Sequence, residues 1–118
     1  MIDYDLIKYY RNLLVRAVPS GTTSISQCVL KSLLKNLGKQ LEFDSMRLYL
    51  YDDIKGKFNA YQIFGDKDIW KDFDITQLRK ERTVYKKLFF VRIRHIRENG
   101  QFLDLGYLGF YTKLFYHR

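Results

Sequence analysis

The sequence predicts an α+β fold, in which a central antiparallel β-sheet carries N-terminal helices on one face. Three observations support this fold class. Apolar residues recur at helical spacing up to residue 37, and the period changes to two from residue 46 onward. Aromatic residues make up 17% of the chain against a single proline, a composition that favours a sheet-containing core over disorder. A chain of 118 residues has the length of one domain with one core.

The first predicted helix covers residues 3–18. Its apolar residues recur at spacings of three and four, the pattern of an amphipathic helix; they are Leu6, Ile7, Tyr10, Leu13, Leu14 and Val18. Pro19 and Gly21 end the helix, because proline disfavours helical geometry in the residue before it and glycine admits turns. We expect residues 1–21 to form a helix and linker, and residues 22–118 to form the α+β domain.

The second predicted helix covers residues 23–37. Hydroxyl side chains at Thr22, Thr23 and Ser24 can accept hydrogen bonds from the first helical turn. Apolar residues then step by four along one face, at Ile25, Val29, Leu33 and Leu37. Gly38 stands where a left-handed residue commonly ends a helix, so we expect the helix to end there.

A hairpin is predicted after the helices. Met46, Leu48 and Leu50 alternate with Arg47, Tyr49 and Tyr51, which is the pattern of a half-buried strand. Residues 52–56 form a polar connection of hairpin length, and an aromatic-rich strand follows over residues 57–64. The two strands should be antiparallel neighbours.

Residues 66–86 form the least regular part of the chain. Charged residues surround Ile69, Trp70 and Phe73, and a short helix capped near Asp74 or Thr76 is expected within residues 75–84. Segments of this kind sometimes cover a pocket, but a plain surface connection is the commoner case.

A second antiparallel pair is predicted at the end of the chain. Residues 88–96 place Phe89, Val91 and Ile93 on one face of a strand, and Phe90, Arg92 and Arg94 on the other. Asn99 and Gly100 favour a tight hairpin turn, since both residues tolerate positive φ. Residues 101–116 then return as one long strand or two short ones, interrupted near Gly106 and Gly109.

This layout resembles a GAF domain, the small-molecule sensor module related to PAS domains. The resemblance lies in residues 26–38 feeding residues 41–53, like the family's second helix entering its first strand, and in the glycine-containing strand at residues 105–111. It implies a GAF/PAS-like fold with helices on one face of the sheet, a ligand pocket on the other, and dimerisation through terminal helices. It also implies a non-enzymatic sensory, regulatory or protein-interaction role. The Asn-Lys-Phe-Asp pattern of cyclic-nucleotide-binding members is missing, so no functional residue is carried over.

The sequence contains no recognisable catalytic or metal-binding constellation. Cys28 falls on the apolar stripe of the second predicted helix, where a buried structural cysteine is the commoner case. His95 on a strand face is better explained as a core or edge histidine, and only His117 accompanies it. We therefore expect no enzyme activity, no metal and no cofactor. No apolar run approaches the roughly 20 residues of a membrane span, and the single cysteine suits a cytoplasmic location.

The chain is basic, and its positive charge is concentrated in one region. Lysine and arginine outnumber acidic residues by 21 to 13, which gives a net charge of +8. Residues 79–97 carry eight of these cations and one acid. Arg92 and Arg94 beside Phe90 could hold phosphate or carboxylate next to a stacked ring, so a nucleic-acid-binding module is the alternative function. A solvated sheet face, or an edge protected by charge, is the competing explanation.

Two sites follow from the predicted fold. For a small planar or anionic ligand, the candidate residues are Tyr49, Tyr51, Tyr61, Trp70, Phe73, Arg92 and Arg94. Trp70 and Phe73 would cover the sheet face that bears the other residues; the alternative is that they fill the interior. In an empty pocket Arg92 should lie in solvent or pair with Asp72 or Asp74.

A homodimer is expected through the first helix, because that helix carries more apolar surface than a short helix needs. The candidate interface residues are Leu6, Tyr10, Leu13 and Leu14. The competing possibility is a helix that packs on its own domain.

Overall fold

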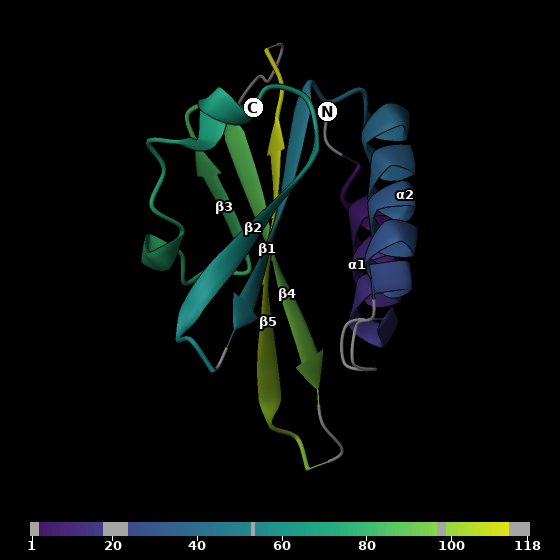
Figure 1. Cartoon of the computed structure of the whole chain (residues 1–118), viewed down its shortest axis with the longest axis vertical. Coiled ribbons are helices and arrows are strands. Elements are labelled where there is room, and N and C mark those ends of the chain that lie inside the picture. The colour runs from purple at the N-terminus through teal and green to yellow at the C-terminus, as the bar shows by residue number, and fades with distance from the viewer. Residues whose placement is uncertain (1–2, 18–23, 53, 97–98, 114–118) are drawn as a thin grey trace.

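Two helices and a five-stranded sheet make up the fold (Figure 1). The computed structural model describes residues 3–17, 24–52, 54–96 and 99–113, and it leaves out the side chains of residues 14–17, 24–30, 95–96 and 102–103. The linker predicted at residues 19–21 lies outside the described residues. The helices are α1 (Tyr4–Ala17) and α2 (Ser24–Leu41), and the strands are β1 (Ser45–Asp52), β2 (Lys57–Phe64), β3 (Arg82–Tyr85), β4 (Leu88–Ile96) and β5 (Phe102–Tyr111).

All strand pairs of the sheet are antiparallel, in the order β2-β1-β5-β4-β3. The neighbouring strands β1 and β5 are the first and last strands in the sequence. Their pairing joins the β1–β2 hairpin to the β4–β5 hairpin. The predicted α+β class with an antiparallel sheet is confirmed. The GAF/PAS-like assignment remains a prediction.

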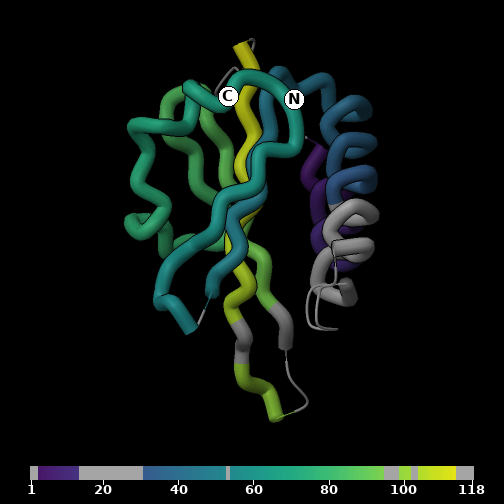
Figure 2. Tube along the Cα trace, in the orientation of Figure 1, coloured from purple at the N-terminus to yellow at the C-terminus, as the bar shows by residue number. Residues whose placement is uncertain are grey.

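Each face of the sheet belongs to a separate apolar cluster. The helix-side cluster joins buried residues of both helices to one sheet face: Ile7, Tyr10, Leu34, Leu37, Met46, Leu48, Ile63, Phe89, Val91, Ile93, Leu105, Leu108 and Phe110. The loop-side cluster comprises Tyr49, Trp70, Leu78, Leu88, Phe90 and Tyr107. The side-chain alternation predicted for β1 and β4 is therefore confirmed. Figure 2 shows the helices on one side of the sheet and the segment of residues 65–81 on the other.

The second helix does not end at the predicted glycine. It continues through Gly38 to Leu41, and Glu42 adopts the left-handed conformation at φ 58° instead. Gly38 is buried, and a Cβ atom there would lie 2.1 Å from Cε1 of Phe64. The missing side chain therefore allows β2 to approach the helix closely. The first helix begins as expected, since Oδ1 of Asp3 accepts a hydrogen bond from the Leu6 amide at 3.1 Å.

The irregular segment is anchored to the sheet by a buried tryptophan. Its two 3₁₀ helices are Lys67–Trp70 and Ile75–Gln77. Trp70 is 1% exposed, and its Nε1 donates to Oγ of Ser45 at 2.9 Å. The expected cap at Asp74 is confirmed, because its carboxylate accepts from the Thr76 amide; a hydrogen bond from the Thr76 hydroxyl also lowers the pKa of Asp74. The edge strand β3 was not predicted.

The final hairpin is longer and less regular than a tight turn. Ile96 pairs with Phe102, so five residues connect the strands, and Gly100 takes positive φ at 82°. The strand β5 is continuous through Gly106 and Gly109. Its register on β4 shifts between Ile93 and Arg94, which marks a β-bulge.

An ion pair connects α1 to the start of β3. Nη1 of Arg11 donates to Oε1 of Glu81 at 2.7 Å, and the guanidinium of Arg82 lies 4.3 Å from the Tyr4 ring centroid. The Glu81 side chain is 58% exposed. The hydrogen bond from Arg11 lowers the pKa of Glu81, although partial desolvation opposes the effect.

The pH dependence of stability should report this ion pair. A carboxyl whose pKa is lowered by folding stabilises the protein above its unfolded pKa of about 4.3, and this contribution disappears as the pH falls through the folded pKa. We expect Glu81→Gln to lower the free energy of unfolding by less than about 1 kcal/mol near neutral pH, because the carboxylate is exposed to water. Urea unfolding at neutral and acidic pH checks this. The difference from the wild type should vanish at acidic pH, and Glu81→Gln should have no further effect in an Arg11→Gln background; a difference that persisted in acid would contradict the assignment.

Candidate ligand pocket

A pocket of about 240 Å³ lies on the loop side of the sheet. We call it the arginine pocket. Its aromatic wall consists of Tyr51, Phe58 and Tyr107, and its charged wall consists of Arg79, Arg92 and Asp104; Leu78 and Gly106 complete the lining. The lining comes from β1, β2, β4 and β5, together with the segment that precedes β3. The pocket therefore forms only when both hairpins and the irregular segment come together.

One buried hydrogen bond fixes the segment to the sheet at this pocket. The hydroxyl of Tyr107 on β5 donates to the carbonyl oxygen of Leu78 at 3.0 Å. Both residues are buried, at 5% and 6% exposure. Leu78 directly follows the second 3₁₀ helix, so this bond determines where the chain places Arg79.

The aromatic wall comes from three neighbouring strands. Tyr51 and Phe58 are direct partners across β1 and β2, and their ring centroids lie 5.2 Å apart. The rings of Phe58 and Tyr107 are 6.0 Å apart. Tyr51 is 43% exposed, so part of this wall is open to solvent and can contact a ligand ring.

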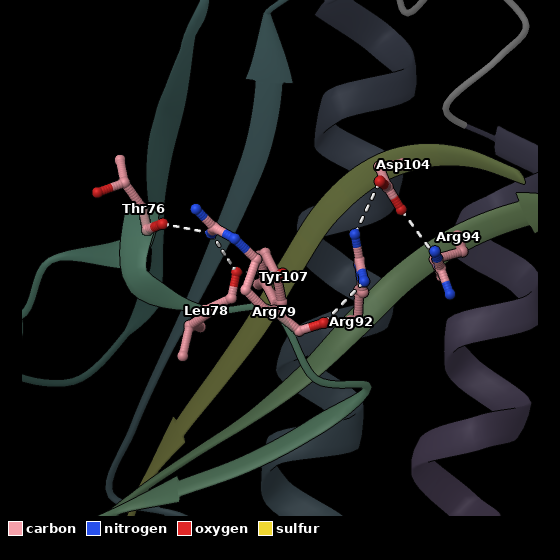
Figure 3. A network of polar contacts seen from close by, with 7 residues as sticks. All are labelled: Thr76, Leu78, Arg79, Arg92, Arg94, Asp104 and Tyr107. Carbon is pink, nitrogen blue, oxygen red and sulfur yellow. Dashed lines mark hydrogen bonds and ion pairs between the residues drawn. The ribbon is translucent and has the colours of Figure 1, made fainter.

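The carboxylate of the charged wall binds two guanidinium groups, one from the wall itself and one from Arg94 beside it (Figure 3). Nη2 of Arg92 donates to Oδ2 of Asp104 at 2.8 Å, and Nε of Arg94 donates to Oδ1 at 2.9 Å. Nη1 of Arg92 donates to the carbonyl oxygen of Arg79 at 2.9 Å. Nε of Arg92 is buried and has no hydrogen-bond partner among the described residues, which is unfavourable for a charged donor.

Arg79 adds a third guanidinium to this region. Its Nη1 donates to the carbonyl oxygens of Thr76 and Leu78 (Figure 3), and the residue as a whole is exposed. Two arginines, Arg79 and Arg92, and the single carboxylate of Asp104 therefore line the pocket, which gives the lining a net positive charge. A planar anion could receive hydrogen bonds from the guanidinium groups while its ring contacts the aromatic wall.

The predicted ligand residues separate into three groups. Tyr51 and Arg92 line the arginine pocket, and Arg94 lies beside it through Asp104. Trp70 and Phe73 pack on Phe90, with ring centroids 5.9 and 4.4 Å from it. They fill the interior of the loop side instead of covering a ligand, which was the alternative considered for them.

Tyr49 and Tyr61 do not contribute to the pocket either. Tyr49 is 5% exposed within the loop-side cluster, and burial raises the pKa of its hydroxyl while the nearby Arg47 opposes the effect. Tyr61 packs against the helix-side cluster, on the opposite face from Tyr49. The prediction that Tyr61 shares a face with Tyr49 and Tyr51 is therefore wrong. In the observed register Tyr61 pairs with Leu48, whereas Tyr49 pairs with Ala60.

The partner of Arg92 also differs from the expectation. Asp104 replaces the predicted Asp72 or Asp74, and Phe58 and Arg79 were missed as lining residues. A correct hairpin register would have identified Phe58, since it directly faces Tyr51. Nothing in the local sequence identifies Asp104, because a β-bulge determines which face it occupies.

The residues proposed for a dimer interface are partly used within the chain. Tyr10 is 7% exposed in the helix-side cluster, and its hydroxyl accepts a hydrogen bond from Nδ2 of Asn36 at 3.1 Å. Leu6 packs against the same cluster, and Leu13 is half-buried. The Leu14 side chain lies outside the described residues. Self-association through α1 remains a prediction that must rest on the residual surface of Leu6 and Leu13 and on exposed Tyr9.

The described residues contain no group of three or more His, Cys, Asp or Glu side chains placed to hold a metal ion. The Cys28 and His95 side chains and all of His117 lie outside the description. Over the residues described, no helix is both long and apolar enough to cross a bilayer. Comparisons with family models, curated proteins and solved structures find no match for the chain.

Proposed function

We propose that the chain is a non-enzymatic, GAF-like regulatory domain that binds a small planar anion in the arginine pocket. The observation that carries the proposal is the composition of this pocket, where Arg79, Arg92 and one carboxylate meet a wall of aromatic rings and Arg94 binds the same carboxylate from beside the pocket. A guanidinium presents planar, paired donors that match carboxylate and phosphate oxygens. Aromatic rings favour a flat ligand that can lie against them.

The position of the pocket supports the GAF-like part of the proposal. The resemblance implies a ligand site on the sheet face away from the helices, and the arginine pocket lies on the loop side. The irregular segment supplies Leu78 and Arg79, as a covering segment in such a domain would do. Binding could therefore change the position of this segment.

The geometry favours a small anion over a nucleic acid. Arg92 and Arg94 share Asp104, and the Arg92 side chain is only 18% exposed. A polyanion backbone needs accessible cations along a surface, whereas these groups converge on one pocket. Weak nucleic-acid binding by the surrounding charge remains the alternative function and is one outcome of the following test.

Titration of the labelled protein with benzoate, followed by amide NMR shifts, tests the proposal. Benzoate should shift the amides of the arginine pocket, while its neutral isostere benzamide should bind much more weakly. We expect Arg79→Gln to weaken benzoate binding about tenfold, the loss expected for one hydrogen bond to a charged group. Arg79 is exposed, so this change should leave the fold intact.

Arg82→Gln is the matched control for charge. It removes the same unit charge, but the Arg82 guanidinium lies over Tyr4 and not in the pocket. An equal loss in both variants would indicate diffuse electrostatic attraction and contradict the site. A failure of benzoate to bind, with salt-sensitive binding of a single-stranded oligonucleotide, would instead favour the nucleic-acid module.

A further inference from the structure

The carboxylate of Asp104 occupies the place that an anionic ligand would take. Its two oxygens accept from Arg92 at 2.8 Å and from Arg94 at 2.9 Å. This bridging arrangement is the one that a ligand carboxylate would make with the same guanidinium groups. Asp104 also lines the arginine pocket, so a second anion competes with it for Nη2 of Arg92.

The two ion pairs that hold Asp104 in this place are partly open to water. The Asp104 side chain is 50% exposed, and ion pairs exposed to this degree contribute little because water screens them. The neighbouring Arg92 keeps one buried donor without a partner among the described residues. When an anion binds, Arg92 could turn so that the anion accepts a hydrogen bond from this donor. The new bond lowers the free-energy cost of separating Arg92 from Asp104.

Asp104 lies where β5 leaves the body of the sheet. The last pair of β5 with β1 is Leu50 with Gly106, whereas residues 102–104 pair with β4 alone. Figure 1 shows the β4–β5 ribbon extending beyond the other strands. A two-stranded ribbon is marginally stable by itself, so the hydrogen bond of Asp104 to Arg92 helps to fix its base to the pocket.

We infer that Asp104 is a built-in competitor for the anion site, and that a small planar carboxylate binds by displacing it from Arg92 and thereby loosens the β4–β5 ribbon. This inference rests on the proposed function and adds a mechanism of regulation to it. The pocket is the sensing end, and the ribbon is the element whose mobility reports occupancy. In the ligand-free protein the hydrogen bond between Asp104 and Arg92 holds the ribbon, and in the ligand-bound protein this bond is broken and the ribbon is more mobile.

Asp104→Asn tests the inference, because asparagine keeps the size of the side chain and removes the competing charge. We expect the variant to bind benzoate about fivefold more tightly than the wild type, the factor that corresponds to one exposed ion pair. In the wild type, benzoate should accelerate hydrogen exchange of the ribbon amides. In the variant these amides should exchange faster without ligand, and benzoate should add little.

Asp72→Asn is the control for the change in net charge. Asp72 is exposed and does not line the arginine pocket, so this variant should bind benzoate like the wild type. Equal affinity of the wild type and Asp104→Asn, or weaker binding by the variant, would overturn the inference while leaving the proposed function standing. No benzoate binding by either protein would overturn both.

Discussion

The Gly106→Ala variant is expected to lose about 3 kcal/mol of stability or more, enough to unfold much of a marginally stable domain. Gly106 has φ 152°, and a Cβ atom there would lie 1.8 Å from the carbonyl oxygen of Tyr49. That oxygen belongs to the backbone of β1, so a side-chain movement cannot relieve the clash. The two central strands would have to separate where Gly106 pairs with Leu50. Urea unfolding followed by fluorescence of the single tryptophan measures the loss.

Gly56→Ala is the matched control for backbone conformation. Gly56 has φ 67°, but nothing lies within 4 Å of a Cβ atom built there. Alanine at Gly56 should therefore cost only about 1 kcal/mol, the penalty of a left-handed residue. Similar losses in both variants would show that conformational strain dominates, and that the close approach of β1 and β5 at Gly106 is not the decisive factor.

The sequence predicts the sheet faces well because alternation along one strand is a local property. The faces of β1 and β4 depend only on the period of two within each strand. Met46 and Leu48 accordingly lie in the helix-side cluster, and Tyr49 and Phe90 lie in the loop-side cluster. The spacing of apolar residues in a helix is also a local property, so the sequence predicts where both helices lie in the chain.

Pairing between strands is less predictable, because one residue more or less in a turn moves every side chain of the partner strand to the other face of the sheet. A connection of residues 52–56 would pair Tyr51 with Lys57 and place Tyr61 on the face of Tyr49. In the structure the first pair is Asp52 with Lys57, and Tyr51 faces Phe58. The error in Tyr61 and the omission of Phe58 thus have the same origin.

The position of Asp104 depends on the β-bulge in the last hairpin. The pairing of Ile93 with Gly106, continued without interruption, would place Asp104 opposite His95 and away from the arginine pocket. The register shift instead pairs it with Arg94 and leaves Leu105 in the helix-side cluster. A bulge depends on contacts across the whole sheet, so this central feature of the site could not be predicted from the local sequence.

Trp70→Ala is expected to lower the free energy of unfolding by about 3–5 kcal/mol, the usual cost of deleting a buried aromatic side chain. Trp70 is 1% exposed and meets the Phe90 ring edge-on at a centroid distance of 5.9 Å. It also packs against β5, because a Cβ atom at Gly109 would lie 2.8 Å from Cζ3 of the indole. Its removal leaves a cavity between the irregular segment and the sheet. Urea unfolding followed by far-ultraviolet circular dichroism measures the loss without a tryptophan signal.

Trp70→Phe separates packing from hydrogen bonding and also tests the role of this residue in binding. Phenylalanine keeps one ring and loses the donor to Ser45, whose Oγ still accepts from Nε2 of Gln62 at 3.0 Å. The loss of stability should therefore be smaller, about 1–2 kcal/mol. Since Trp70 does not line the arginine pocket, the folded variant should bind benzoate as tightly as the wild type. Weaker binding at unchanged stability would return Trp70 to the ligand site that the sequence predicts for it.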